Sequence, residues 1–65
     1  MIIVVNGKER AVSATTLAGV LVELGLAETR IATAIGGEFV PRAARETCVL
    51  REGDKVEILA PMQGG

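Results

Sequence analysis

The chain opens with a short apolar run and a second extended segment, joined by a two-residue turn. Residues 1–5 are all apolar and rich in β-branched types, and Asn6-Gly7 follows them directly. Both positions of this dipeptide tolerate the positive φ angles that a two-residue hairpin turn requires. Lys8 to Ser13 then continues with strand period but few apolar residues. The pattern predicts a hairpin whose second strand lies at the edge of a sheet.

The next segment changes to the period of an α-helix. Its apolar positions fall at i, i+3, i+4 and i+7 on one stripe: Leu17, Val20, Leu21 and Leu24. Thr15 or Thr16 is suited to cap the N-terminus through its hydroxyl group. Gly25 stands where helices commonly end in the left-handed conformation, so that Leu26 can fold back onto the last turn. Gly19 inside the helix costs about 1 kcal/mol relative to alanine, and we expect a close approach to the sheet as its reason.

The second half predicts three more extended segments. Gly36-Gly37 separates two short apolar segments as a second hairpin turn, and Pro41 ends the second of them. Residues 43–47 are polar and fit one turn of helix, and Cys48 to Leu50 fits a brief pairing. After a turn signal in the next four residues, Lys55 to Ala60 alternates again and forms the last strand.

The expected order is therefore strand, strand, helix, strand, strand, strand. This order predicts an α+β fold with a mixed sheet of four to five strands and one main helix packed on one face. If the last strand lies parallel beside the first, the link through the helix is right-handed. This arrangement is the β-grasp, or ubiquitin-like, fold. We assign residues 1–60 to the β-grasp domain and residues 61–65 to a flexible C-terminal tail.

Composition limits the classes of partner. The 65 residues form one domain with an aliphatic core, because 49% of the residues are hydrophobic and Phe39 is the single aromatic residue. A net charge of −1, with no basic cluster, argues against a nucleic-acid partner. The first apolar run is too short for a signal peptide or a membrane span. One cysteine forms no internal disulfide. We therefore expect a soluble, cytoplasmic protein with no membrane partner.

Residue types that perform catalysis or bind metals are scarce. The chain has no histidine, the commonest metal ligand and general base. Its carboxylates show no paired pattern and no glycine-rich phosphate loop accompanies them: Glu38, Glu46, Glu52, Asp54 and Glu57. We predict a protein that is not an enzyme and binds no metal or cofactor of its own. Cys48 is either a thiol that relays sulfur or a small apolar residue in a short strand, and the second is favoured because no cation or helix start activates it.

The first and last strands indicate an apolar surface for a partner. One helix covers one face of a sheet, yet the first strand is apolar on both sides, and Leu59 is out of step with the apolar positions of its own strand. We expect exposed aliphatic side chains on the face away from the helix, with Ile3 and Leu59 as candidates. The alternative is that residues 41–48 fold over this face. Arg42 and Arg45 are either a docking contact for an acidic partner or solvated surface residues.

The last five residues carry the distinctive chemistry of the chain. Pro61 cannot donate to a sheet, so a tail of about 16 Å would extend from it. The tail consists of Pro61, Met62, Gln63, Gly64 and Gly65. Because its end has no side chains, the tail is able to thread a narrow channel in a partner and present the Gly65 carboxylate. An ATP-dependent partner would convert this group into an acyl adenylate, and a sulfur nucleophile would displace AMP to give a thiocarboxylate. The alternative is an unstructured end without function.

Several segments resemble the ThiS family, the ubiquitin-like sulfur carriers of bacterial thiamine biosynthesis. They are "VNG", "ATTLAGVLVELG", "FVPRAAR" and "EGDKVEILAPMQGG", so the resemblance covers the whole chain. It implies that a ThiF-type adenylating enzyme activates Gly65 with ATP and magnesium. It also implies that a cysteine desulfurase or another donor supplies sulfur, and that thiazole synthase uses it to build a thiazole ring. The protein would then be a recycled co-substrate, monomeric by itself, which meets these partners with the sheet face beside the tail.

Other functions stay open at this point. The small subunit of molybdopterin synthase shares the fold and the tail chemistry, although it is usually longer and its segment before the glycines differs. A carrier for tRNA thiolation or cysteine synthesis is a second alternative. A third, of a different class, is a non-catalytic β-grasp binding module that never carries sulfur.

Overall fold

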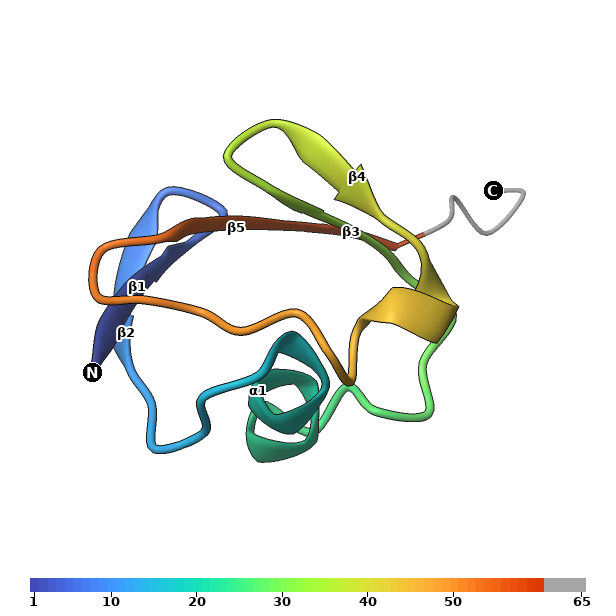
Figure 1. The fold of residues 1–65 in the computed structure, drawn as a ribbon, viewed down its shortest axis with the longest axis horizontal. Coiled ribbons are helices and arrows are strands. Elements are labelled where there is room, and N and C mark those ends of the chain that lie inside the picture. Colours follow the sequence, from blue (N-terminus) through green and yellow to red (C-terminus); the bar gives the residue numbers. More distant parts are fainter. Residues whose placement is uncertain (61–65) are drawn as a thin grey trace.

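The computed structural model of the chain describes residues 1–60. Its elements are β1 (Ile2–Val5), β2 (Lys8–Ala11), α1 (Leu17–Glu23), β3 (Ala32–Ile35), β4 (Glu38–Val40), the 3₁₀ helix η1 (Arg42–Ala44) and β5 (Lys55–Leu59). The strands form one sheet in the order β2-β1-β5-β3-β4, in which β5 runs parallel to β1 and antiparallel to β3. Figure 1 shows α1 crossing one face of this sheet. The predicted α+β, β-grasp architecture is confirmed.

Both predicted hairpin turns are present. Asn6 and Gly7 have φ angles of 49° and 84°, and Gly36 and Gly37 have φ angles of 56° and 87°. Two consecutive residues with positive φ give the turn whose twist matches that of paired strands. The turns therefore set the pairing of β1 with β2 and of β3 with β4.

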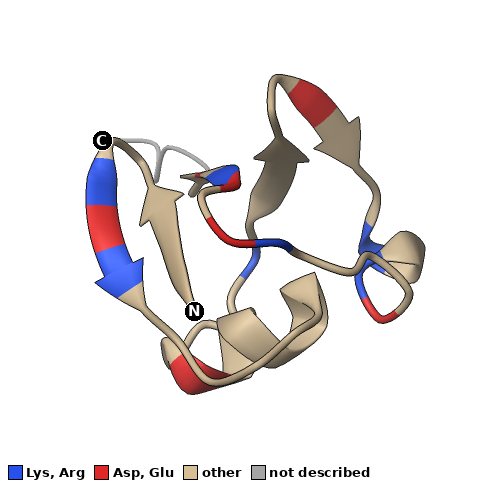
Figure 2. Ribbon diagram, turned by 60° about the vertical axis from the view of Figure 1, so that its left-hand side comes forward, with Lys and Arg blue, Asp and Glu red and all other residues tan. Residues whose placement is uncertain are grey.

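The edge strand β2 is fully exposed and ends earlier than predicted. It carries Lys8, Glu9 and Arg10 in succession, and these charges discourage pairing with another chain (Figure 2). The predicted strand continued to Ser13, but the backbone amide groups of Ser13 and Ala14 instead donate to the Glu23 carboxylate at 2.9–3.0 Å. This carboxylate draws the chain away from the sheet and toward the helix.

Both ends of α1 form as the sequence predicted. The Thr16 hydroxyl accepts a hydrogen bond from the Gly19 amide at 3.1 Å, which identifies Thr16 as the N-cap. At the other end Gly25 has a φ angle of 78°, and the Leu26 amide donates to the Leu21 carbonyl at 2.7 Å. The chain therefore reverses in a Schellman motif directly after the helix.

The core lies between α1 and the inner face of the sheet. Its buried hydrophobic residues are Ile3, Val5, Val12, Leu17, Val20, Leu21, Leu50, Val56 and Ile58. Three of the four residues of the predicted helix stripe are among them, and Leu24 is half-buried against the same cluster. Two polar residues, Thr33 and Arg45, are buried as well.

The expected reason for Gly19 is wrong. A Cβ atom at this position would lie 2.8 Å from the Cβ of Ala14 and 3.2 Å from the Thr16 hydroxyl oxygen. The space is therefore taken by the segment that enters the helix and by its cap. The sheet is not involved.

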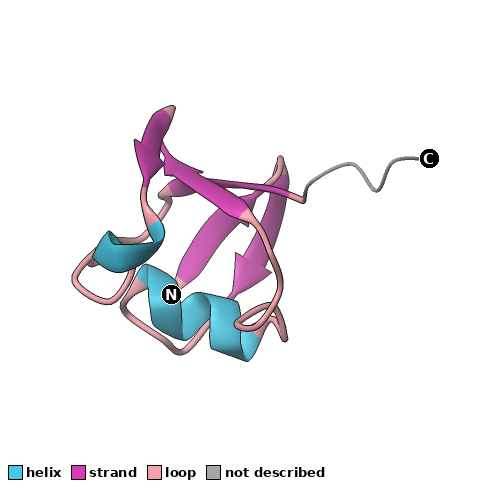
Figure 3. Cartoon of the chain, turned by 90° about the vertical axis from the view of Figure 1, so that its right-hand side faces the viewer, coloured by secondary structure: helices cyan, strands magenta, loops and turns pink. Residues whose placement is uncertain are grey.

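Residues 41–50 lie on the same side of the sheet as the helix. The Leu17 amide donates to the Cys48 carbonyl at 2.9 Å, and the Ala18 amide donates to the Arg45 carbonyl at 3.0 Å. Figure 3 shows η1 and α1 together on one side of the strands. This segment therefore leaves the opposite face uncovered. Cys48 is half-buried and packs against the core, as predicted for a small apolar residue, but the strand predicted for residues 48–50 is only an isolated bridge between Val49 and Thr16.

Candidate functional site

The central strand β5 leads to the C-terminal residues in which the sequence places the chemistry. β5 is paired on both sides, with β1 through Lys55 and Val56 and with β3 through four residue pairs. Because β5 is paired on both sides, the position of its last residue, Leu59, is fixed relative to the sheet. Pro61, Met62, Gln63, Gly64 and Gly65 lie outside the described residues, so their roles stay predictions.

Asn6 extends the hold on β5 beyond the end of β1. Its side-chain amide nitrogen donates to the Ile58 carbonyl at 3.0 Å, and its side-chain oxygen accepts from the Ile58 amide at 2.8 Å. The backbone amide of Asn6 also donates to the Val56 carbonyl at 2.9 Å. One side chain thus pairs with β5 as the next residue of a neighbouring strand would, and it fixes the strand two residues before Ala60.

The face of the sheet away from α1 is the open face. The strand register places on it Ile2, Val4, Ala32, Ala34, Phe39, Lys55, Glu57 and Leu59. Phe39 and Leu59 are each 69% exposed, and Ile2 is 44% exposed. Phe39 lies opposite Ala34, and Leu59 lies opposite Ala32 on the neighbouring pair of strands. Phe39 and Leu59 therefore lie toward the end of β5, whereas Ile2 lies near its start, because Val4 pairs with Lys55 in the parallel register.

A shallow hollow runs along β5 on this face. It has a volume of about 750 Å³ and is bounded by the Asn6-Gly7 and Gly36-Gly37 turns. Lys55, Glu57 and Leu59 line it, so its floor combines both charges with an apolar end. Exposed apolar residues rimmed by charged ones are typical of a surface that binds another protein.

Two of the four residues predicted for the partner surface are not on it. Ile3 is fully buried, because the odd-numbered positions of β1 face the helix, and Ile2 and Val4 face outward instead. Arg45 is 8% exposed, and its Nε donates to the Thr33 hydroxyl at 3.1 Å and its Nη2 to the Ile31 carbonyl at 2.7 Å. Leu59 and Arg42 are exposed, as a surface role requires, and their partner contacts stay predictions.

Phe39 is an exposed residue of this face that was not predicted from the sequence. A phenylalanine in a three-residue strand after Gly36-Gly37 suggests a core residue, but β4 is an edge strand and its middle position faces away from α1. The register of the hairpin indicates this exposure, because Phe39 pairs with Ala34 and paired residues face the same side of a sheet, here the side away from α1. An exposed phenylalanine is the largest apolar contribution that this face offers.

The carboxyl group of Glu23, at the end of α1, has a pKa shifted by its hydrogen bonds. The amides of Ser13 and then Ala14 lower the pKa of the Glu23 carboxyl below its ordinary value, because they donate hydrogen bonds to its ionised form. Residues 1–60 contain no cluster of three His, Cys, Asp or Glu side chains arranged to hold a metal ion. Within the same residues, no helix combines the length and apolar character needed to cross a membrane.

Solved structures of known proteins share this fold. A crystal structure of the thiamine biosynthesis protein ThiS from Geobacter metallireducens has a TM-score of 0.84 and 30% sequence identity, with both chains covered completely. A solution structure of a thiamine biosynthesis protein from the same organism has a TM-score of 0.79 at 30% identity, covering 100% of this chain and 88% of the other.

Sequence comparison agrees with the comparison of structures. A thiazole synthase from Paramagnetospirillum magneticum is 38% identical over an alignment of 66 residues, which takes in 100% of this chain but 20% of that protein. The chain thus spans about a fifth of the length of this relative. The ThiS family model matches residues 3–65. Since that match covers nearly the whole sequence and the solved ThiS structure superposes over its full length, this chain belongs to the ThiS family.

Proposed function

We propose that this chain is the sulfur carrier of a thiamine pathway, and that its Gly65 carboxylate becomes a thiocarboxylate which donates sulfur for thiazole formation. The observation that carries the proposal is the family match through residue 65, which includes the Gly-Gly end. The central position of β5 supports it, because this strand leads directly into those residues. The likeness to a thiazole synthase supports the downstream step.

The chemistry takes place on one carboxyl group. A C-terminal carboxyl has a pKa of about 3.5, so it is ionised at neutral pH and is a poor electrophile. In the first step a carboxylate oxygen of Gly65 attacks the α-phosphorus of ATP, pyrophosphate leaves, and an acyl adenylate forms. In the second step a hydrosulfide ion attacks the acyl carbon, AMP leaves and one proton is released. The product is the thiocarboxylate, in which one sulfur atom has replaced one oxygen atom.

The domain and the tail have separate tasks in this proposal. Residues 1–60 dock on each partner, and residues 61–65 bring the carboxylate into the partner's active site. The partners are a ThiF-type adenylating enzyme that uses ATP and magnesium, a cysteine desulfurase or another sulfur donor, and thiazole synthase. The open face, with Phe39 and Leu59 beside the end of β5, is the surface we assign to the adenylating enzyme and to thiazole synthase. The protein itself is a co-substrate, and this chemistry takes place in the cytoplasm.

Intact-mass spectrometry tests the proposal directly. The protein is incubated with a ThiF-type adenylating enzyme, magnesium, ATP and sodium sulfide. We expect its mass to rise by the difference between one sulfur and one oxygen atom, and we expect deletion of Gly65 to abolish the gain. The first step requires a free carboxylate on Gly65, so the same instrument is used to weigh the protein isolated from its own cells. An unchanged mass after incubation contradicts the carrier function and favours a binding module.

Genetics separates the thiamine pathway from its alternatives. Deletion of the gene is expected to create a requirement for thiamine or thiazole. If molybdenum enzymes lose activity instead, the chain is a subunit of molybdopterin synthase, and the thiamine assignment is wrong. Lost tRNA thiolation or a cysteine requirement would identify the other carriers.

A further inference from the structure

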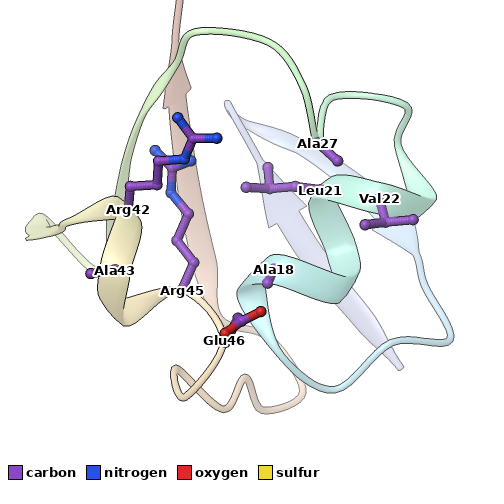
Figure 4. Close-up of a pocket in the computed structure, with 8 residues that line it drawn as sticks. All are labelled: Ala18, Leu21, Val22, Ala27, Arg42, Ala43, Arg45 and Glu46. Carbon is purple, nitrogen blue, oxygen red and sulfur yellow. The ribbon is translucent and has the colours of Figure 1, made fainter.

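A second hollow lies on the helix side of the molecule, between α1 and η1. We call it the α1–η1 groove. It has a volume of about 580 Å³ and is lined by Ala18, Leu21, Val22, Ala27, Arg42, Ala43, Arg45 and Glu46. Figure 4 shows the side chains of α1 on one side of it and the guanidinium groups of Arg42 and Arg45 on the other. None of these residues belongs to the open face.

The charges at the groove are unbalanced. Glu46 is the one acidic residue among the eight that line it, against two arginines. Arg45 is 8% exposed, and both hydrogen bonds of its guanidinium group go to neutral groups, the Thr33 hydroxyl and the Ile31 carbonyl. A buried guanidinium ordinarily has a carboxylate partner, because removing its charge from water is costly. No carboxylate among residues 1–60 is hydrogen-bonded to Arg45.

The rest of the lining is apolar. Val22 is 65% exposed although it is a large aliphatic residue on a helix, and three alanines line the groove together with it. Exposed side chains on an amphipathic helix are usually polar, so Val22 is the exception on the outer surface of α1. The complementary ligand therefore presents a carboxylate next to apolar side chains.

We infer that the α1–η1 groove docks an acidic and apolar segment of the protein that delivers sulfur to the activated tail. This inference rests on the proposed function. An acyl adenylate hydrolyses readily in water, so sulfur has to arrive while the adenylating enzyme still holds the carrier. That enzyme occupies the open face and the tail, and the donor needs a different surface. The groove is lined by residues of α1 and η1, which lie on the opposite side of the sheet from the open face (Figure 3), so it remains uncovered in this arrangement.

Sulfur transfer from such a donor takes place in two steps. The terminal sulfur of a protein persulfide attacks the acyl carbon of Gly65, AMP leaves, and an acyl disulfide links the two proteins. A dithiol reductant then cleaves the S–S bond, which releases the thiocarboxylate and the donor thiol. Free hydrosulfide performs the reaction without any docking, so the two sulfur sources separate docking from chemistry.

The test compares these sources on one variant at a time. Thiocarboxylate formation is followed by intact mass with the adenylating enzyme and ATP, once with a cysteine desulfurase loaded beforehand as its persulfide, with dithiothreitol added only when the reaction is stopped, and once with sodium sulfide. For Arg42→Glu we expect the ratio of the desulfurase rate to the sulfide rate to fall about tenfold. Arg51→Glu makes the same change of charge at an exposed position outside the groove, and we expect its ratio to stay at the wild-type value.

The outcomes are distinguishable. An equal ratio in Arg42→Glu and the wild type overturns the docking inference and leaves the carrier function standing. No mass gain from either source in the wild type overturns the carrier function and the inference that rests on it.

A titration followed by ¹⁵N NMR examines the groove without either enzyme. The probe is a short synthetic peptide of alternating leucine and glutamate, and its control is the leucine–lysine counterpart. We expect saturable shifts at the amides of Ala18, Val22 and Ala43 with the acidic peptide alone. Equal shifts with the lysine peptide, or shifts centred on Phe39 and Leu59, would overturn the assignment of this groove.

Discussion

Replacing Arg45 by methionine tests whether the buried arginine stabilises or destabilises this domain. The change keeps most of the aliphatic stem and removes the charge with two hydrogen bonds. The Thr33 hydroxyl retains a partner, because it also donates to the Val40 carbonyl at 2.9 Å. The Ile31 carbonyl loses its side-chain donor, which was 2.7 Å away. The Ile31 carbonyl is therefore the one acceptor that loses a hydrogen bond without a replacement from the Thr33 pair.

The expected loss is about 2 kcal/mol. A hydrogen bond from a charged donor is worth roughly 1.5–3 kcal/mol, and because Ile31 is half-buried, its carbonyl loses only part of the roughly 1–3 kcal/mol that a fully buried acceptor without a partner costs. Relief from the desolvation of the guanidinium offsets part of this sum. A domain of this length is stable by roughly 3–10 kcal/mol, so the loss is a large fraction of the total. It corresponds to a fall in Tm of about 8–16 °C.

Urea denaturation followed by far-ultraviolet circular dichroism measures this loss, since the chain has no tryptophan or tyrosine to serve as a fluorescent probe. Arg42→Met is the matched control, because Arg42 is exposed, and we expect its free energy of unfolding to change by less than about 0.5 kcal/mol. If Arg45→Met is as stable as the wild type or more so, the desolvation of the buried guanidinium outweighs its two hydrogen bonds, and the expectation that they stabilise the domain is refuted.

Three further predictions concern the open face, the helix and the pH dependence. Phe39→Ser should weaken binding to the adenylating enzyme about tenfold in calorimetry, because covering this phenyl group is worth roughly 1.5 kcal/mol, and unchanged affinity would remove Phe39 from the interface. Gly19→Ala should lower Tm although alanine favours helices by about 1 kcal/mol, because its Cβ would lie 2.8 Å from Ala14, and a higher Tm would show that the entering segment yields freely. The lowered pKa of Glu23 makes its contribution to stability fully present above its ordinary value near 4.5 and lost as the pH falls through the folded-state pKa. Glu23→Gln should therefore flatten the acid limb of stability measured against pH, and an unchanged limb would contradict the role of the Ser13 amide.

The sequence determined those features that depend on neighbouring residues. Asn6-Gly7 and Gly36-Gly37 identified both hairpins, because positive φ angles at two consecutive positions are a local steric matter. Thr16 and Gly25 marked the ends of the helix for the same kind of reason. The order of these elements then predicted the β-grasp sheet. For the candidate site, the sequence indicated the tail and the exposure of Leu59, and the tail stays a prediction because it lies outside the described residues.

The tertiary structure alone decided which side chains face a partner. Ile2 and Ile3 are both isoleucine in one strand, and only the position of α1 buries Ile3 and exposes Ile2. Arg45 is charged and was expected at the surface, yet the distant residues Ile31 and Thr33 hold it inside. Phe39 has the largest apolar side chain in its hairpin and lies outside, because the face to which it belongs carries no helix. Local sequence sets the alternation along a strand, whereas the choice of buried side depends on where a separate element packs.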